Sequence, residues 1–165
     1  DARYLRDIWE MASAHSQDPN TQVASALVTW AGGIVLAAWN ELPPALCGKG
    51  YPRTPETKNY CFEHAERRVL YKSVANKLSV GGLQMYGTWI ACSECARAII
   101  EFNISRVVTF RRLVERTPPK WKESVREGLT MMRDAGITVI GWEGNLNSSR
   151  TIRFNGEVLG SEVLV

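Results

Sequence analysis

Segments of strand length and helix length alternate through the second half of the chain. Apolar periodicity and turn residues predict, in chain order, a helix at 63–73, a strand at 83–90, a helix at 93–102, a strand at 106–110, a helix at 120–135 and a strand at 138–142. Gly136 follows the last helix where a C-terminal cap belongs. This alternation predicts parallel strands joined by right-handed crossovers, with helices over both faces of the sheet.

The first half of the chain adds a helix and a strand pair. A helix is predicted from apolar residues at spacings of three and four, namely Leu5, Ile8, Trp9 and Ala12. Segments 23–29 and 33–39 flank a short turn and predict an antiparallel hairpin, whereas the proline- and glycine-rich segment 41–60 is predicted to be one long loop. The fold class is therefore α/β, a three-layer α/β/α sandwich around a mixed sheet of about five strands.

Length and charge limit the function classes. A chain of 165 residues predicts one domain, with a core at about 1–142 and a tail at 143–165 that could be a strand, an interface arm or partly disordered. The 20 basic and 17 acidic residues leave a net charge of +3, which permits a phosphate-bearing ligand but makes nucleic acid an improbable partner. The sequence has no apolar run of membrane-spanning length and no signal-peptide pattern, so we expect a cytoplasmic location and no membrane partner.

Two short motifs supply the chemistry. His64 and Glu66 stand at the start of one predicted helix, and Cys92 and Cys95 form a C-x-x-C pair at the start of the next. One imidazole and two thiolates give three ligands for a tetrahedral Zn²⁺ and leave the fourth position open for water, as a catalytic zinc site requires. Helix N-termini also favour thiolate over thiol.

Glu66 has a different task from the ligands. It lies two residues after His64, where it can take a proton from zinc-bound water and pass it to a leaving nitrogen. This is the chemistry of hydrolytic deamination, and the combination H-x-E followed by C-x-x-C is the signature of zinc deaminases. Either motif alone is weak, because an isolated C-x-x-C also occurs in redox and structural metal sites. A thioredoxin-like interpretation leaves His64 and Glu66 unexplained.

At these motifs the sequence resembles the cytidine deaminase superfamily and, within it, the deoxycytidylate (dCMP) deaminases. The resemblance extends from about Met11 to Trp142. It rests on four segments, which are S-Q-D-P-N-T-Q-V at 16–23, W-N-E-L-P at 39–43, F-E-H-A-E at 62–66 and W-I-A-C-S-E-C-A at 89–96. Ala24 and Ala91 stand where the family usually has glycine and proline.

The resemblance implies a role for individual residues. Zinc would be bound by His64, Cys92 and Cys95, with Glu66 as the proton shuttle. For the substrate, Asn40 would hydrogen-bond the sugar, the Ala65 backbone N–H would meet the pyrimidine carbonyl, and Val23 would line the base. From the residues alone, Asn40 is equally a turn residue and Val23 a core residue.

The resemblance also implies a substrate and partners. The substrate would be dCMP or a C5-modified dCMP, converted to the corresponding dUMP and ammonia in pyrimidine deoxynucleotide metabolism. dCTP and dTTP would be possible effectors, dCTP with Mg²⁺, and a homo-oligomer, with a hexamer favoured, would form in the cytoplasm or, for a viral protein, the host cytoplasm. Trp39 and Glu41 replace a tyrosine and a glycine in the segment that the family uses around its effector.

Several alternatives stay open. The chain could deaminate another heterocycle, such as guanine or a riboflavin precursor, could edit nucleic acid with the same fold, or could be a zinc-stabilised regulatory protein. Candidate cations for a 5′-phosphate are Arg53, Lys58, Arg111 and Arg112. Cys47 and Cys61, with His15, could hold a second zinc, although buried free thiols are the default expectation, and most of the six tryptophans are expected in the core.

Overall fold

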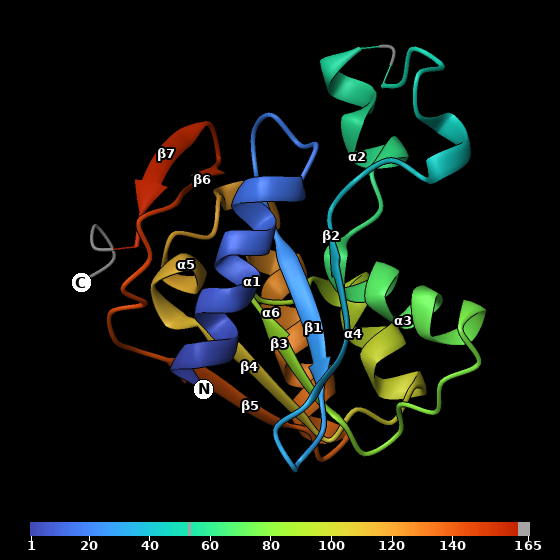
Figure 1. The fold of residues 1–165 in the computed structure, drawn as a ribbon, viewed down its shortest axis with the longest axis vertical. Coiled ribbons are helices and arrows are strands. Elements are labelled where there is room, and N and C mark those ends of the chain that lie inside the picture. The colour runs from blue at the N-terminus through green and yellow to red at the C-terminus, as the bar shows by residue number, and fades with distance from the viewer. Residues whose placement is uncertain (53, 162–165) are drawn as a thin grey trace.

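A five-stranded mixed sheet forms the centre of the protein in a computed structural model that describes residues 1–52 and 54–161 (Figure 1). Its strands are β1 (Ala24–Val28), β2 (Ile34–Trp39), β3 (Gln84–Gly87), β4 (Arg106–Phe110) and β5 (Thr138–Trp142), in the spatial order β2-β1-β3-β4-β5. β1 runs antiparallel to β2 and β3, while β3, β4 and β5 are parallel. The predicted hairpin and the predicted parallel crossovers are both confirmed.

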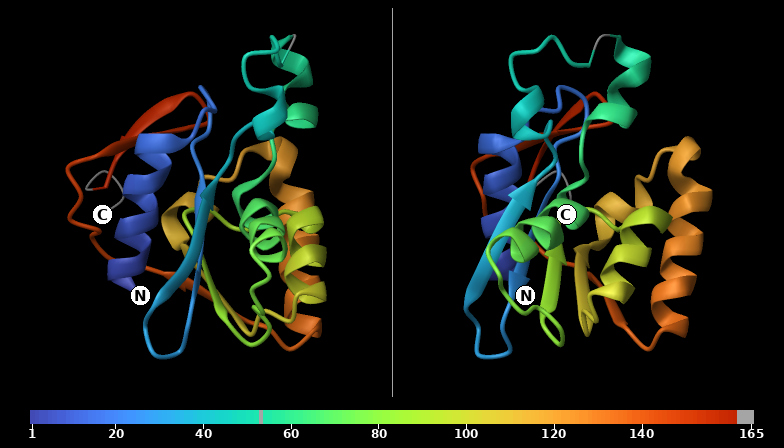
Figure 2. Two further views of the ribbon diagram at one scale, coloured as in Figure 1. Left: turned by 45° about the vertical axis from the view of Figure 1, so that its right-hand side comes forward. Right: turned by 90° about the vertical axis from the view of Figure 1, so that its right-hand side faces the viewer.

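Helices cover both faces of this sheet (Figure 2). One face carries α1 (Ala2–His15), and the other carries α3 (Ala65–Ala75), α4 (Ser93–Glu101) and α6 (Pro119–Asp134). The apolar stripe of α1 is almost fully buried because its spacing of three and four residues puts all its members on the sheet side of the helix; they are Leu5, Ile8, Trp9 and Ala12. The predicted three-layer α/β/α sandwich is confirmed.

The close packing of α6 on α4 positions the start of α4. A Cβ atom on Gly128 of α6 would lie 3.0 Å from the carbonyl oxygen of Ala91 and 3.1 Å from the carbonyl carbon of Cys92. The Ser124 hydroxyl of α6 also accepts a hydrogen bond of 3.1 Å from the backbone N–H of Ser93. Helix α6 therefore fixes the backbone at one of the predicted metal ligands.

The prediction of a featureless loop at 41–60 is wrong. The segment contains the 3₁₀ turns η1 (Pro44–Leu46) and η2 (Pro55–Thr57), and its end lies in the short helix α2 (Lys58–Cys61). Two contacts hold α2 in place: the Lys58 ammonium pairs with Asp18 at 2.8 Å, and the Glu63 N–H donates to the Glu41 carbonyl at 2.9 Å. These turns have no apolar periodicity, because tertiary contacts rather than local packing stabilise them. The sequence pattern therefore did not predict them.

In the described part of the tail the strand alternative is confirmed, while the end of one strand and one further helix differ from expectation. Residues 151–160 form a second, two-stranded sheet of β6 (Thr151–Phe154) and β7 (Glu157–Gly160), packed against α1 (Figure 1). Strand β3 ends at Gly87 rather than near residue 90, because the chain turns and brings the Trp89 carbonyl to 2.7 Å from the position of a Cβ on Gly87. Helix α5 (Arg111–Glu115) was not predicted.

No helix in the described part of the chain is long and apolar enough to cross a membrane.

Candidate metal centre and substrate pocket

The predicted ligands His64, Cys92 and Cys95 come together, although 28 residues separate the imidazole from the first thiol. His64 Nδ1 lies 3.5 Å from Cys92 Sγ and 3.4 Å from Cys95 Sγ, and the three ligand atoms lie within 4.8 Å of one another. A tetrahedral zinc ion about 2.3 Å from sulfur and about 2.0 Å from nitrogen sets these atoms about 3.6 Å apart. The side chains therefore fit Zn²⁺ with little movement.

Two helix N-termini create this cluster. His64 is the N-cap of α3, Cys92 is the N-cap of α4, and Cys95 lies in the first turn of α4. The pKa of the Cys92 thiol is lowered to about 3, because the Cys95 thiol donates to its sulfur and the His64 ring lies beside it. The same pairing and burial raise the pKa of the Cys95 thiol well above its ordinary value. A thiolate is the form that binds metal, so without an ion the pair favours one thiolate, at Cys92.

Glu66 is a buried carboxyl group beside these ligands. Its side chain projects from the first turn of α3, the residue is 5% exposed, and Oε2 lies 3.7 Å from Cys95 Sγ. Burial raises its pKa to about 7. A carboxyl group with a pKa near neutrality both accepts and releases protons readily, which is the requirement for a general acid and base.

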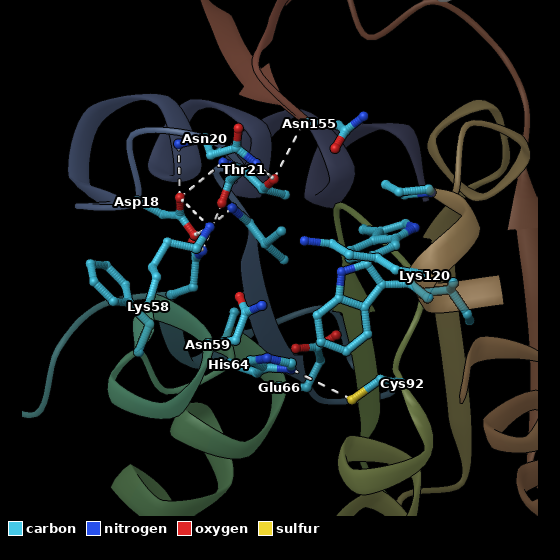
Figure 3. A pocket seen from close by; sticks show the side chains of 18 residues that line it. Asp18, Asn20, Thr21, Lys58, Asn59, His64, Glu66, Cys92, Lys120 and Asn155 are labelled. Carbon is cyan, nitrogen blue, oxygen red and sulfur yellow. Dashed lines mark hydrogen bonds and ion pairs between the residues drawn. The ribbon is translucent and has the colours of Figure 1, made fainter. Parts of the chain in front are cut away.

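The cluster lies at the base of a pocket that opens to solvent (Figure 3). His64, Glu66 and Cys92 line the base, and the lining residues Asn59, Lys120 and Asn155 are exposed and mark the mouth. The candidate acid–base residue Glu66 therefore lies at one end of the pocket, and the opening to solvent lies at the other.

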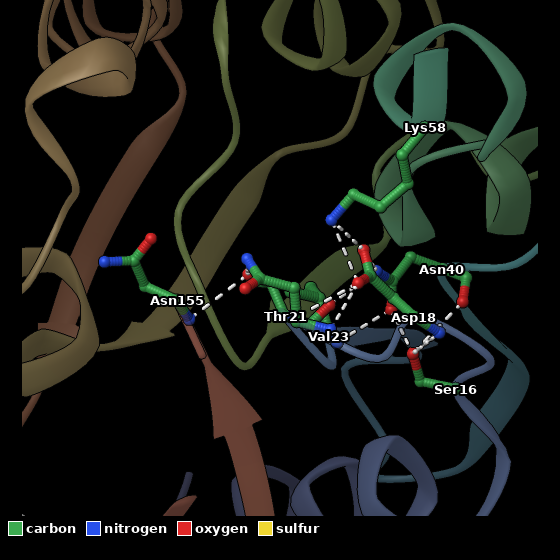
Figure 4. Close-up of polar contacts among 8 residues, drawn as sticks. Ser16, Asp18, Thr21, Val23, Asn40, Lys58 and Asn155 are labelled. Atoms are coloured by element: carbon green, nitrogen blue, oxygen red, sulfur yellow. Dashed lines mark hydrogen bonds and ion pairs between the residues drawn. The ribbon is translucent and has the colours of Figure 1, made fainter. Parts of the chain in front are cut away.

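A hydrogen-bond network builds one wall of the pocket (Figure 4). The Asn40 amide oxygen accepts from the Ser16 hydroxyl at 2.6 Å and from the Val23 N–H at 2.8 Å. Its amide nitrogen donates to the Thr21 carbonyl at 2.7 Å and to Asp18 at 3.2 Å. These contacts use the full hydrogen-bonding capacity of the amide, so a sugar contact by Asn40 requires one of them to be exchanged.

The other residues predicted for substrate binding divide into two groups. Val23 and Ala65 are buried and line the pocket, as Lys58 also does. Arg111 pairs with Glu115 and Glu143 instead, and neither it nor Arg112 lines the pocket. Arg53 lies outside the described residues.

The second metal site has no support in the described part of the chain, where His64, Cys92 and Cys95 are the one group of three potential ligands. Cys47 is exposed and Cys61 is half-buried, so the expectation of buried thiols is also wrong. His15 stacks on Trp39 with ring centroids 4.5 Å apart.

Several pocket residues were missed from the sequence, among them Trp89, Lys120, Trp121 and Asn155. The Trp121 ring lies edge-on to His64, with centroids 5.8 Å apart, and Trp89 lies edge-on to Trp121 at 6.3 Å. These two tryptophans were assigned to the core because they fall within apolar segments. Lys120 and Trp121 directly follow two prolines, a signal for a helix start rather than for a ligand site.

A family model described as the cytidine and deoxycytidylate deaminase zinc-binding region matches residues 1–111. The chain belongs to this family. The resemblance inferred from the motifs is confirmed, and the matched family is one defined by zinc binding, in agreement with the ligand cluster of His64, Cys92 and Cys95.

Individual relatives agree with the family assignment. The deoxycytidylate deaminase of Homo sapiens is 31% identical over 111 residues, which are 64% of this chain and 61% of the human protein. The probable deoxycytidylate deaminase of Drosophila melanogaster is 29% identical over 109 residues, 59% of this chain and 53% of that protein. The chain thus spans between about half and three-fifths of these relatives.

Solved structures also show the same fold. The dCMP deaminase from cyanophage S-TIM5 superposes with a TM-score of 0.63 at 20% identity, over 84% of this chain and 94% of that one. The guanine deaminase from Nitrosomonas europaea superposes with a TM-score of 0.53 at 14% identity, over 85% of this chain and 75% of that one. Proteins named for different bases therefore share this architecture.

Proposed function

We propose that the chain is a zinc-dependent deaminase that converts dCMP, or a C5-modified dCMP, to the corresponding dUMP and ammonia. The observation that carries the proposal is the buried Glu66 carboxyl beside the His64, Cys92 and Cys95 cluster, at the base of a pocket that opens to solvent. The relatives named for deoxycytidylate deamination support this choice of substrate.

In this mechanism Glu66 moves the proton. It accepts a proton from the attacking water, and the oxygen bonds to the amino-bearing carbon of the base. The carboxylic acid then delivers a proton to the exocyclic nitrogen, the carbon–nitrogen bond breaks, and ammonia leaves. Zinc held by His64, Cys92 and Cys95 would lower the pKa of the attacking water.

Other residues orient the base. Val23 and Trp121 offer apolar surfaces on the pocket wall, and Trp121 lies against the His64 ring. We propose that the base lies against these two side chains, with its amino group toward Glu66 and its carbonyl toward the Ala65 backbone N–H. Aromatic surfaces bind a flat base mainly by excluding water from both faces.

The test is ammonia release from zinc-replete protein supplied with dCMP at neutral pH. We expect release of one ammonia per dUMP formed. Parallel reactions contain 5-methyl-dCMP, guanine or a cytosine-containing single-stranded oligonucleotide, and a further reaction contains dCMP with dCTP and Mg²⁺. Turnover of guanine or the oligonucleotide without turnover of either nucleotide contradicts the proposal. If dCMP is deaminated only in the presence of dCTP, the substrate assignment stands and dCTP acts as the predicted effector.

A further inference from the structure

The mouth of the pocket contains polar side chains from two segments that lie beyond the family match at residues 1–111. Lys120 is the second residue of α6, directly after Pro118 and Pro119, and Asn155 is in the turn between β6 and β7. Both line the same pocket as His64 and Glu66 (Figure 3). The motifs that define the family account for the base of the pocket, and these two residues remain to be explained.

The two lysines of the pocket differ in how their charge is balanced. The Lys58 ammonium lies 2.9 Å and 2.8 Å from the two carboxylate oxygens of Asp18, so its charge is neutralised within the protein. In the described part of the chain Lys120 has no ion pair and no hydrogen bond from its ammonium group. Lys120 is therefore the pocket cation whose charge is available to a ligand.

Asn155 is held at the mouth by its backbone and leaves its side chain free. Its N–H donates to the Thr21 hydroxyl at 3.2 Å (Figure 4). The next N–H, from Gly156, donates to the Asn20 carbonyl at 2.9 Å. Asn155 has a φ of +52°, a conformation that asparagine tolerates better than most residues. Among the described residues nothing hydrogen-bonds the Asn155 side-chain amide, so both its donors and its acceptor can meet a ligand.

A row of aromatic contacts fixes these segments relative to the metal centre. The Phe154 ring, next to Asn155, lies edge-on to Trp89 with centroids 5.2 Å apart. Trp89 contacts Trp121, and Trp121 contacts His64. Because Phe154 is 2% exposed, the turn of the hairpin cannot move without disturbing a packed contact.

We propose that Lys120 and Asn155 form the subsite for the phosphate of the nucleotide, with the lysine as its charge partner and the amide as a hydrogen-bond donor. This inference rests on the proposed function, because deamination requires the amino group to face Glu66. The phosphate is at the other end of a nucleotide and then points to the mouth. An ammonium group binds phosphate as a point charge, and its hydrogen bonds to an anion are stronger than neutral ones.

The first experiment compares dCMP with deoxycytidine, which differs only in lacking the phosphate. We expect Lys120→Gln to lower kcat/KM for dCMP by about 10- to 100-fold and to leave that for deoxycytidine within about twofold. Lys120→Arg retains the charge and restores most of the loss. Lys122→Gln is the matched control, since Lys122 is exposed on the same helix and does not line the pocket. Equal losses for both substrates overturn the phosphate assignment.

The second experiment tests the hairpin. Asn155→Asp keeps the size and the backbone preference but brings a negative charge to the mouth. We therefore expect it to lower kcat/KM for dCMP more than kcat/KM for deoxycytidine. Asn147→Asp is its control, because Asn147 is exposed with a φ of +53° and is not a pocket residue. An effect of Asn147→Asp as large as that of Asn155→Asp overturns the role of Asn155.

A binding measurement separates this inference from the proposed reaction. Trp89 and Trp121 line the pocket and report binding by fluorescence. In a Glu66→Gln background, which prevents turnover, adding Lys120→Gln should raise the Kd for dCMP but not for deoxycytidine. If wild-type protein releases no ammonia while this selective loss is seen, the reaction is wrong and the phosphate subsite stands. If dCMP is deaminated while Lys120→Gln changes neither Kd, the subsite is wrong and the reaction stands.

Discussion

At the scale of single residues, Glu66 separates metal binding from turnover. It lies beside the ligand sulfurs but is not needed to complete the set of one imidazole and two thiolates. Glu66→Gln keeps the shape and removes the proton carrier, so we expect zinc to stay at one ion per chain while deamination falls by about 100- to 10,000-fold. Metal analysis and ammonia release on the same sample check this. Retained activity in the variant contradicts the assigned role.

Asp18 is the residue on which the pocket wall depends. Its carboxylate is 4% exposed and accepts hydrogen bonds from Lys58, from the backbone N–H groups of Asn20 and Thr21, and from the Asn40 amide. Asp18→Asn leaves the half-buried Lys58 ammonium without its counter-charge, and we expect a loss of about 1–3 kcal/mol in the free energy of unfolding, measured with urea.

An exposed ion pair provides the comparison for Asp18. Glu157 pairs with Arg116 at 3.4 Å, and both side chains are well exposed, at 69% and 43%. Glu157→Gln should change the free energy of unfolding by about 0–1 kcal/mol, because solvent screens such pairs. If Asp18→Asn and Glu157→Gln lower the free energy of unfolding equally, the burial of Asp18 does not explain how much its contacts stabilise the protein.

At the scale of elements, the metal centre depends on how closely α6 approaches the start of α4. Alanine is favoured over glycine inside a helix by about 1 kcal/mol. At Gly128, however, the added methyl group meets the backbone of Ala91 and Cys92 at 3.0 Å and 3.1 Å, and backbone atoms cannot swing aside. We expect Gly128→Ala to shift Cys92, weaken zinc binding in competition with a chelator, and lower the melting temperature.

The control for this substitution lies on the outer side of α6. Glu123 is exposed, and Glu123→Ala gains helix propensity without a new contact, so zinc affinity should not change. Wild-type zinc affinity in Gly128→Ala contradicts the idea that the spacing of α4 and α6 sets the ligand geometry.

The elements differ in how well local sequence predicts them. The helices at 2–15, 65–75, 93–101 and 119–134 repeat apolar residues at helical spacing. The first was predicted without bounds, and the other three were predicted within two residues of their observed ends. Helix α2 depends on a distant partner, because Lys58 is bound by Asp18. Contacts of that kind leave no local pattern, so the segment before α3 was predicted as a loop.

At the scale of the whole molecule, the residues of the site also differ in how well local sequence predicts them. His64, Glu66, Cys92 and Cys95 could be found because their spacing is itself a chemical pattern. Asn155 could not, since its place at the mouth depends on the β6–β7 turn hydrogen-bonding to residues 20 and 21. The proposed single domain, the homo-oligomer and the effectors stay predictions.

The C-terminal hairpin packs against both the N-terminal helix and the wall of the pocket. Phe154 is buried with α1 in the core on one face of the sheet and also contacts Trp89 of the pocket wall. We expect Phe154→Ala to lower the free energy of unfolding by about 3–5 kcal/mol. Phe154→Leu, a milder change of about 1 kcal/mol, keeps the protein folded while removing the edge-on ring contact.

Activity in Phe154→Leu then tests whether the hairpin belongs to the site. Because Asn155 is the next residue, loosening the turn should raise KM for dCMP more than it lowers kcat. Val158→Ala is the control on the same hairpin, since Val158 is 64% exposed and its truncation should change stability by less than about 0.5 kcal/mol. If Phe154→Leu is less stable but has the KM of the wild-type protein, the hairpin supports the fold without shaping the pocket, and the mouth must be closed by other residues.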